Sequence, residues 1–216
     1  MTDNVIPFNP LDKLNLGASV ADAMLSRKVE PLGDIQEFKG AGVYAIYYKG
    51  MFEPYREIAV RNRDDKFTVP IYVGKAVPAG ARKGGGVGTM TQGKPLFNRL
   101  SEHAGSIRAT VNLDIADFDC RYIVVDDIWI PLGESLLIAR YSPLWNTLID
   151  GFGNHDPGKG RYNGARPRWD VLHPGRDWAA KCKDRNETAD DVAGDVRTFL
   201  SSMNFPESDR FLNADN

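Results

Sequence analysis

Two tyrosines on neighbouring apolar segments have side chains that could take part in proton transfer. Tyr44 lies in GVYAIYY (42–48) and Tyr72 lies in PIYVG (70–74). A phenol has a pKa of about 10, so it acts as a base near neutral pH only where positive charge favours its phenolate. Tyrosine is also common in strands, where the ring packs in the core and the hydroxyl finds one partner. Each tyrosine alone is compatible with both interpretations.

Four further polar residues follow along the chain. Arg99 and His103 are one turn apart in a segment with helical periodicity (95–108), so they share one helix face, which an ordinary solvated face would also explain. Glu134 opens a later helical segment, where the helix dipole favours a carboxylate without any function. Asn146 follows Trp145 at a position that also suits a turn.

Two glycine-rich segments carry unbalanced positive charge. Residues 75–99 hold five cations and no acid, and residues 151–176 hold five cations and two acids. Residues 183–216 hold four cations and eight acids, so the overall net charge of -2 conceals this asymmetry. Clustered positive charge is expected for a protein that binds a polyanion, although solvated loops also collect glycine and lysine.

Several other kinds of site are disfavoured. GTMTQGK (88–94) matches a phosphate-binding pattern, but Pro95 follows where that motif needs Ser or Thr. Two cysteines and three scattered histidines suit neither a disulfide framework nor a zinc site, which favours a reducing, cytoplasmic location. The N-terminal MTDNVIPFNP does not resemble a signal peptide, and no apolar stretch approaches the roughly 20 residues that span a bilayer.

The apolar periodicity predicts a small α+β domain that would position these residues. Strands are expected at 42–48, 70–74 and 118–125. Helices are expected within 1–38, over 95–108, from near Gly133 to before Pro143, and over 178–203. The 95–108 helix has an apolar stripe made of Phe97, Leu100, Ala104 and Ile107.

The order and spacing of these residues resemble the GIY-YIG nuclease signature. GVY (42–44) and YVG (72–74) look like its two halves, and Arg99, Glu134 and Asn146 match the arginine, glutamate and asparagine that follow. The flanking segments are similar to the branch of type II restriction endonucleases that cuts the GC-only palindrome CCGCGG, in which a histidine follows the arginine by one turn, as His103 does. The segments that carry this likeness are GVYAIYY, PIYVGKAVPAG, RLSEH, PLWNTLIDGFGNHDPGKGRY and WDVLHPGR.

The resemblance implies a fold and a domain organisation. The expected core is a small central three-stranded antiparallel sheet flanked by helices, with DNA-wrapping loops and terminal helical additions. An N-terminal helical extension would occupy 1–38, and an acidic C-terminal helix or tail would occupy 183–216. The nuclease domain would span 39–182, with DNA-binding loops at 75–94 and 151–176.

The resemblance also implies roles in phosphodiester hydrolysis. Glu134 would bind one Mg²⁺ per active site, since one carboxylate can suffice for a cation that keeps several waters. Arg99 would hold phosphate oxygens. Tyr44 would be the general base for the attacking water, or His103 would take the proton while Tyr44 orients the water. Tyr72 would position the water or the phosphate, and Asn146 would support the site by hydrogen bonding.

Double-stranded DNA is the partner that this resemblance implies. A palindromic site requires a two-fold protein, so a homodimer is expected, with a cognate DNA methyltransferase as functional partner. The alternatives are a structure-specific or homing nuclease with the same core and a DNA-binding protein that has lost cleavage. The residues expected to contact DNA are Lys75, Arg82, Lys83, Lys94, Lys159, Arg161, Asn163, Arg166 and Arg168.

Overall fold

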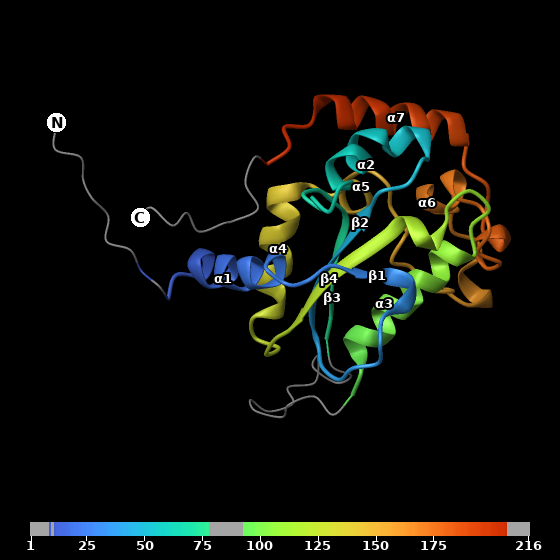
Figure 1. Cartoon of the computed structure of the whole chain (residues 1–216). Helices are drawn as coiled ribbons and strands as arrows, with labels where there is room; N and C mark the ends of the chain where they lie inside the picture. The colour runs from blue at the N-terminus through green and yellow to red at the C-terminus, as the bar shows by residue number, and fades with distance from the viewer. Residues whose placement is uncertain (1–8, 10, 78–92, 207–216) are drawn as a thin grey trace, which may run out of the picture.

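A four-stranded antiparallel sheet forms the centre of the fold (Figure 1). The structure is a computed structural model that describes residues 9, 11–77 and 93–206. The strands are β1 (Glu30–Pro31), β2 (Gly42–Tyr48), β3 (Pro70–Ala76) and β4 (Phe118–Val124), in the spatial order β1-β4-β2-β3. The three expected strands are present, but the expected number was wrong, because β1 also pairs with β4. A strand of two residues is too short to show alternation in the sequence.

The central strand β2 is buried along its whole length because helices cover both faces of the sheet. Tyr44, Ile46 and Tyr48 face the larger core, and the residues between them face the smaller one, as a period of two requires. Gly42 lies so close to β4 that a Cβ there would stand 1.9 Å from the carbonyl oxygen of Ile123. Only glycine therefore fits at the first position of GVY.

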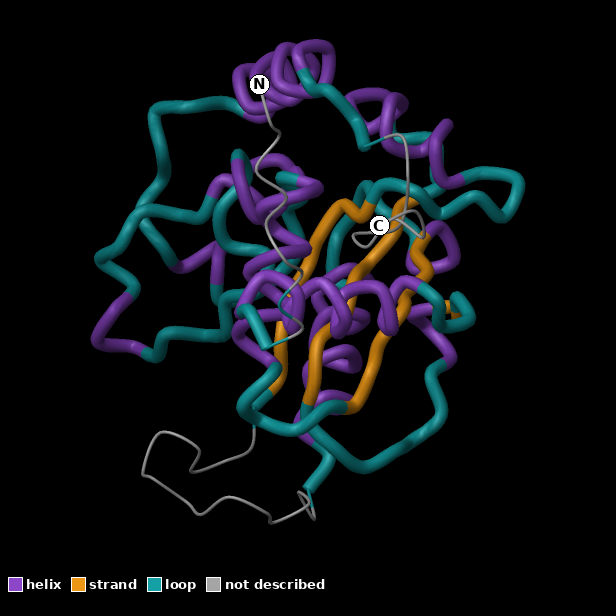
Figure 2. Tube along the Cα trace, turned by 90° about the vertical axis from the view of Figure 1, so that its left-hand side faces the viewer, coloured by secondary structure: helices purple, strands orange, loops and turns teal. Residues whose placement is uncertain are grey.

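Helices divide between the two faces of the sheet. The larger core contains side chains from α2, α3, α5, α6 and α7, and the smaller core contains side chains from α1 and α4, on the left in Figure 1. The α-helices are α1 (Lys13–Leu25), α2 (Arg56–Asn62), α3 (Pro95–Arg108), α4 (Ile130–Tyr141), α5 (Leu144–Thr147), α6 (Arg168–Leu172) and α7 (Ala189–Ser202). Figure 2 shows the strands side by side with a helix crossing in front of them. Within the described residues no helix is long and apolar enough to cross a membrane.

The described helices near the two ends of the chain, α1 and α7, pack onto this core. Gly17 allows α1 to approach α4, since a Cβ there would stand 3.3 Å from the carbonyl oxygen of Leu132. Helix α7 begins with a capping box between Thr188 and Asp191 and buries an apolar stripe against the sheet's larger core. The acidic segment after residue 183 therefore contains a helix, α7, that packs onto the same core.

Candidate active site

Tyr44 and His103 form a buried hydrogen-bonded pair between β2 and α3. The hydroxyl oxygen of Tyr44 lies 2.6 Å from Nε2 of His103, and both side chains are buried. Tyr44, like Ile46, faces the larger core, and that core contains the side chains of α3. The α3 face that carries His103 is thus turned toward the sheet, and the solvated-face explanation does not apply to this residue.

The environment sets the protonation state of this pair. Burial raises the pKa of Tyr44 well above its usual value, and Tyr72 adds to the rise while Arg99 opposes it. Burial lowers the pKa of His103 well below 6.5, and the charge of Arg99 lowers it further. Near neutral pH the phenol is therefore protonated and the imidazole is neutral. In the tautomer that carries its proton on Nδ1, His103 can accept the Tyr44 hydroxyl proton at Nε2.

Tyr72 lies on β3 beside this pair. Its ring centroid is 6.2 Å from that of Tyr44 and 5.2 Å from that of His103. Gly74 is the register partner of Tyr44, and a Cβ at Gly74 would stand 2.4 Å from the Tyr44 hydroxyl oxygen. The glycine of YVG thus makes room for the phenol that lies across it.

Arg99 connects the tyrosines to a later segment of the chain. Its Nη2 donates to the carbonyl oxygen of Gly153 at 2.8 Å, and its Nη1 donates to Nε2 of His155 at 2.7 Å and to Glu102 at 3.2 Å. Its positive charge opposes the rise in the pKa of both Tyr44 and Tyr72, so it lies within electrostatic reach of both. The guanidinium is only partly exposed, which suits a fixed phosphate ligand.

Glu134 approaches the site from the opposite face of the sheet. Helix α4 packs against the edge strand β3, and Oε2 of Glu134 accepts a hydrogen bond of 2.5 Å from Nζ of Lys75. The negative charge of Glu134 raises the pKa of Tyr44 and Tyr72, so the carboxylate interacts with both phenols. The sheet edge is therefore where side chains from the two faces meet.

Asn146 holds α5 against the exposed edge of β3. Its Oδ1 accepts from the N–H of Val73 and its Nδ2 donates to the C=O of Val73, both at 2.8 Å. β3 is an edge strand, so these two backbone groups point away from its strand partner. The amide side chain replaces a missing strand at the residue between Tyr72 and Gly74.

Glu134 suits a hard cation that takes one protein carboxylate and keeps several waters, rather than a metal held by protein ligands alone. Among the described residues no group of three or more His, Cys, Asp or Glu could hold a metal. Mg²⁺ is commonly bound by one or two carboxylates together with water and phosphate oxygens. The carboxylate of Glu134 already faces one cation, the ammonium group of Lys75. It can thus supply one ligand to a site completed by water and DNA phosphate.

The basic residues of the first predicted DNA-binding loop are described only in part. Lys75 pairs with Glu134, and Lys94 pairs with Glu37 at 2.6 Å. In the second loop, Arg161 and Asn163 have exposed side chains. Arg82, Lys83 and the side chain of Lys159 lie outside the described residues. DNA contact by this set remains a prediction.

Arg166 and Arg168 lie further from solvent and have protein partners. Arg166 pairs with Asp184 at 2.8 Å. Arg168 donates to the carbonyl oxygen of Leu148 at 3.1 Å and pairs with Glu187 and Asp195, so it ties α6 to α7. Acidic residues from the C-terminal segment thus already form ion pairs with both arginines.

The sequence did not identify the 151–155 segment as a wall of this site. Phe152 stacks on His103 with ring centroids 4.5 Å apart, and Gly153 and His155 contact Arg99. The available signal was a histidine within the glycine-rich run GFGNHDPG, a few residues after Asn146. That run was interpreted only as part of a basic DNA-binding loop.

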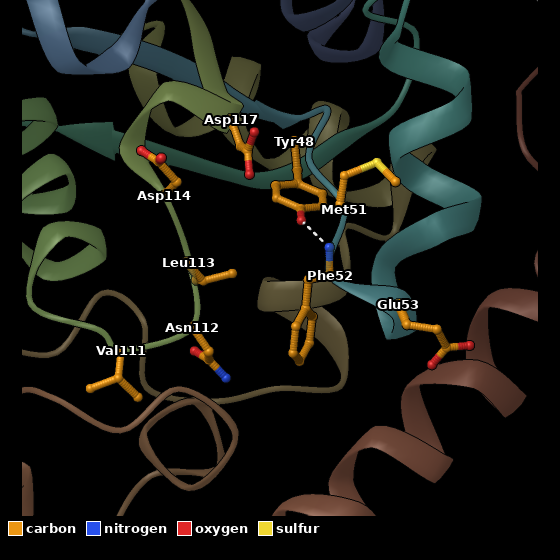
Figure 3. Close-up of a pocket in the computed structure, with 9 residues that line it drawn as sticks. All are labelled: Tyr48, Met51, Phe52, Glu53, Val111, Asn112, Leu113, Asp114 and Asp117. Atoms are coloured by element: carbon orange, nitrogen blue, oxygen red, sulfur yellow. Dashed lines mark hydrogen bonds between the residues drawn. The ribbon is translucent and has the colours of Figure 1, made fainter.

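A separate pocket lies at the other end of β2 (Figure 3). It has a volume of about 540 Å³ and is formed by residues from 48–53 and from 111–117. The N–H of Phe52 donates to the hydroxyl of Tyr48 at 2.7 Å inside it, and burial raises the pKa of Asp117. None of the six predicted catalytic residues lines this pocket, so it is not part of the candidate active site.

Comparison with known proteins agrees with this geometry. Two tyrosines on adjacent antiparallel strands, an arginine on the next helix and a glutamate on a later one define a nuclease domain of the GIY-YIG class. The family model described as the Eco29kI GIY-YIG domain matches residues 36–200, and the chain belongs to this family of restriction endonuclease domains. No curated protein matches the chain.

Proposed function

We propose that this protein is a type II restriction endonuclease that hydrolyses both strands of double-stranded DNA at a GC-rich palindrome, CCGCGG, with Mg²⁺ bound at Glu134. The observation that carries the proposal is the Tyr44–His103 hydrogen bond of 2.6 Å beside Arg99. This arrangement brings a proton acceptor, His103, close to a residue that can bind phosphate, Arg99. Membership of a restriction endonuclease family supports DNA as the substrate.

Proton transfer in this proposal runs from water through Tyr44 to His103. The raised pKa of Tyr44 makes a free phenolate unfavourable near neutral pH, so the phenol does not act as a base alone. As the attacking water gives a proton to the Tyr44 oxygen, the hydroxyl proton of Tyr44 moves to the neutral Nε2 of His103. One proton enters the phenol and one leaves it, and His103 is the final acceptor.

The remaining residues bind and orient the phosphate. Arg99 would hold its non-bridging oxygens, and Tyr72 would orient the phosphate or the water. Mg²⁺, when bound at Glu134, supplies stabilisation of the charge on the phosphate and on the leaving 3′ oxygen. Asn146 keeps β3 in place so that Tyr72 meets the pair formed by Tyr44 and His103.

DNA binding in this proposal uses the basic segments and a second copy of the chain. The exposed Arg161 and Asn163 and the cations near Lys75 would follow the duplex, and arginine or lysine would read the guanine O6 and N7 atoms of a GC-only site. A palindrome requires a homodimer that cuts one strand per subunit. A cognate DNA methyltransferase would protect the host's own sites.

The test is digestion of unmethylated plasmid DNA with Mg²⁺, followed by sequencing of the fragment ends. We expect discrete fragments that end within CCGCGG for the wild-type protein. We expect no cleavage, but unchanged or tighter DNA binding, for Glu134→Gln, because Lys75 loses its ion-pair partner and becomes available to phosphate. Glu57→Gln removes a carboxylate from an ion pair on α2 and is the matched control.

Other outcomes assign the protein to another class. Fragments without a common end sequence would indicate a structure-specific nuclease. Tight binding of duplex DNA without cleavage by the wild-type protein would indicate a DNA-binding protein that has lost its activity. Loss of binding in Glu134→Gln would contradict a role confined to the metal.

A further inference from the structure

Residues 151–155 form a wall of the candidate active site that is attached to Arg99 at two points. Nη2 of Arg99 donates to the carbonyl oxygen of Gly153 at 2.8 Å, and Nη1 donates to Nε2 of His155 at 2.7 Å. A Cβ on Gly153 would stand 2.8 Å from the Tyr72 hydroxyl oxygen and 2.9 Å from Nη2 of Arg99. The backbone of this segment therefore lies directly against both side chains.

Arg176 holds the same segment from behind. Its guanidinium donates to the carbonyl oxygens of Gly151, Phe152 and Asn154 at 2.9–3.1 Å. It is also paired with the buried carboxylate of Asp170. The carbonyls on either side of Gly153 thus point toward Arg176, while that of Gly153 points toward Arg99. These hydrogen bonds therefore fix the position of the backbone that leads into His155.

Two exposed side chains share one edge of Arg99. Nη1 donates to His155 at 2.7 Å and to Glu102 at 3.2 Å, and Nε2 of His155 lies 3.6 Å from the Glu102 carboxylate. The side chains of His155 and Glu102 are 63% and 49% exposed. A phosphate that binds this edge would displace both side chains, whereas the Gly153 carbonyl is held by its backbone.

The hydrogen bond from Arg99 requires a neutral imidazole at His155, because a guanidinium only donates. A protonated imidazole has no acceptor and two donors, so it would leave Arg99 and turn to an anion. The anions available there are Glu102, already 3.6 Å away, and a phosphate held by Arg99.

We propose that His155 is a further phosphate-binding residue of this site, covering Arg99 in the free protein and contacting the scissile phosphate as an imidazolium when DNA is bound. The inference rests on the proposed function, since it needs DNA as the ligand. Glu102 acts in opposition in the free protein, because its carboxylate occupies the edge that the phosphate needs and repels that phosphate.

In the described part of the chain, charged and titratable groups face His155 from α3 and from its own segment. Arg99, Glu102 and His103 lie on α3, and Arg176 donates to the carbonyl oxygen of Asn154, the residue before His155. On its own segment, the neighbouring Asp156 accepts from the N–H of Gly158 and from the hydroxyl of Tyr162.

The other two of the three histidines stay neutral in the pH range of the experiment described below. Burial lowers the pKa of His103 well below 6.5 and that of His173 to about 3, so both stay neutral between about pH 8 and pH 6. His155 is the histidine that lies against the outer edge of Arg99, where a phosphate could reach it.

The experiment measures the dissociation constant of a fluorescent duplex containing CCGCGG, by anisotropy, between about pH 8 and pH 6. All variants are made in the Glu134→Gln background so that the duplex stays intact. We expect the parent to bind about tenfold more tightly at the lower pH, as for one linked proton. His155→Gln keeps an acceptor for Arg99 but takes up no proton, so its dissociation constant should stay within about twofold across this range.

A second pair of variants tests the opposing carboxylate. Glu102→Gln should bind the duplex several-fold more tightly than the parent, and Glu57→Gln, which removes the same charge from α2, should not. An undiminished pH dependence in His155→Gln would overturn the proposal. A parent that binds no duplex at any pH, while remaining folded by circular dichroism, would instead overturn the proposed function on which the inference rests.

Discussion

Gly74 and Tyr44 face one another across the β2–β3 pair with no room for a side chain on the glycine. A Cβ on Gly74 would stand 2.4 Å from the hydroxyl oxygen of Tyr44 and 2.6 Å from the ring carbon that bears it. The same hydroxyl is hydrogen-bonded to His103. The second half of the signature therefore ends in glycine because the first half places a phenol on top of it.

Gly74→Ala should slow cleavage strongly while most of the fold survives. The new methyl group must push the Tyr44 ring away, which breaks the contact with His103, and we expect cleavage to fall by about 10²-fold or more. The rate of plasmid cleavage and the thermal melt of the same sample measure the two effects separately.

Gly105→Ala is the matched control for this change. Gly105 lies on α3, and a Cβ there would meet nothing within 4 Å. Alanine at a compatible helical position stabilises a protein by about 0.4–1 kcal/mol, so this variant should melt slightly higher and cleave normally. Full activity in Gly74→Ala would contradict the close contact described above.

Tyr44 and His103 should behave as one unit in catalysis. We expect Tyr44→Phe and His103→Gln each to reduce the single-turnover cleavage rate by about 10²–10⁴-fold, the usual value of a positioned acid or base. The double variant should be no slower than the worse single variant, because either change already interrupts the proton relay. Multiplicative losses would show that the two residues act independently.

The chain contains a second tyrosine–histidine pair that serves as a control. Tyr55 and His173 are buried and lie 2.5 Å apart between hydroxyl oxygen and Nε2, but neither contacts Arg99. His173→Gln should lower stability and leave the single-turnover rate of the folded fraction unchanged.

The sequence predicted the elements that have a strong local pattern. β2 and α3 have the expected bounds, because one is an unbroken apolar run between glycines and the other begins at a proline. It also singled out six candidate catalytic side chains through their order along the chain, and their roles in cleavage stay predictions. These signals depend only on residue type and spacing.

What the sequence did not show depends on contacts between distant segments. Nothing local indicates that β1 pairs with β4, or that α4 begins at Ile130 rather than near Gly133. In α3 the apolar stripe included Phe97, but Leu96 is the residue that is fully buried. The attachment of the 151–155 segment to Arg99 spans more than 50 residues and leaves no periodic trace.

Acid should destabilise the protein through its buried histidines. Burial lowers the pKa of His173 to about 3, so the unfolded chain binds a proton below about pH 6.5 while the folded chain does not. Stability is therefore lost as the pH falls from 6.5 toward 3, at about 1.4 kcal/mol per pH unit for each such histidine. His103 contributes in the same direction.

Urea unfolding at several pH values measures this loss. His173→Gln should be less stable than the wild-type protein near neutral pH, since it breaks the contacts with Tyr55 and Asn112. Its free energy of unfolding should fall less steeply on acidification. Parallel slopes for the two proteins would contradict a neutral His173 in the folded state.

Arg161 and Arg168 should separate DNA contact from structural support within one basic segment. Arg161 is exposed, so Arg161→Ala should weaken duplex binding and reduce the slope of log affinity against log salt by about 0.9, as loss of one phosphate contact does. Arg168 already binds Leu148 and two carboxylates. Arg168→Ala should therefore lower the free energy of unfolding by about 1–3 kcal/mol. The salt dependence of Arg168→Ala shows whether Arg168 also contacts DNA. If it does, the slope of log affinity against log salt falls in the variant; if Arg168 only joins α6 to α7, the slope is unchanged.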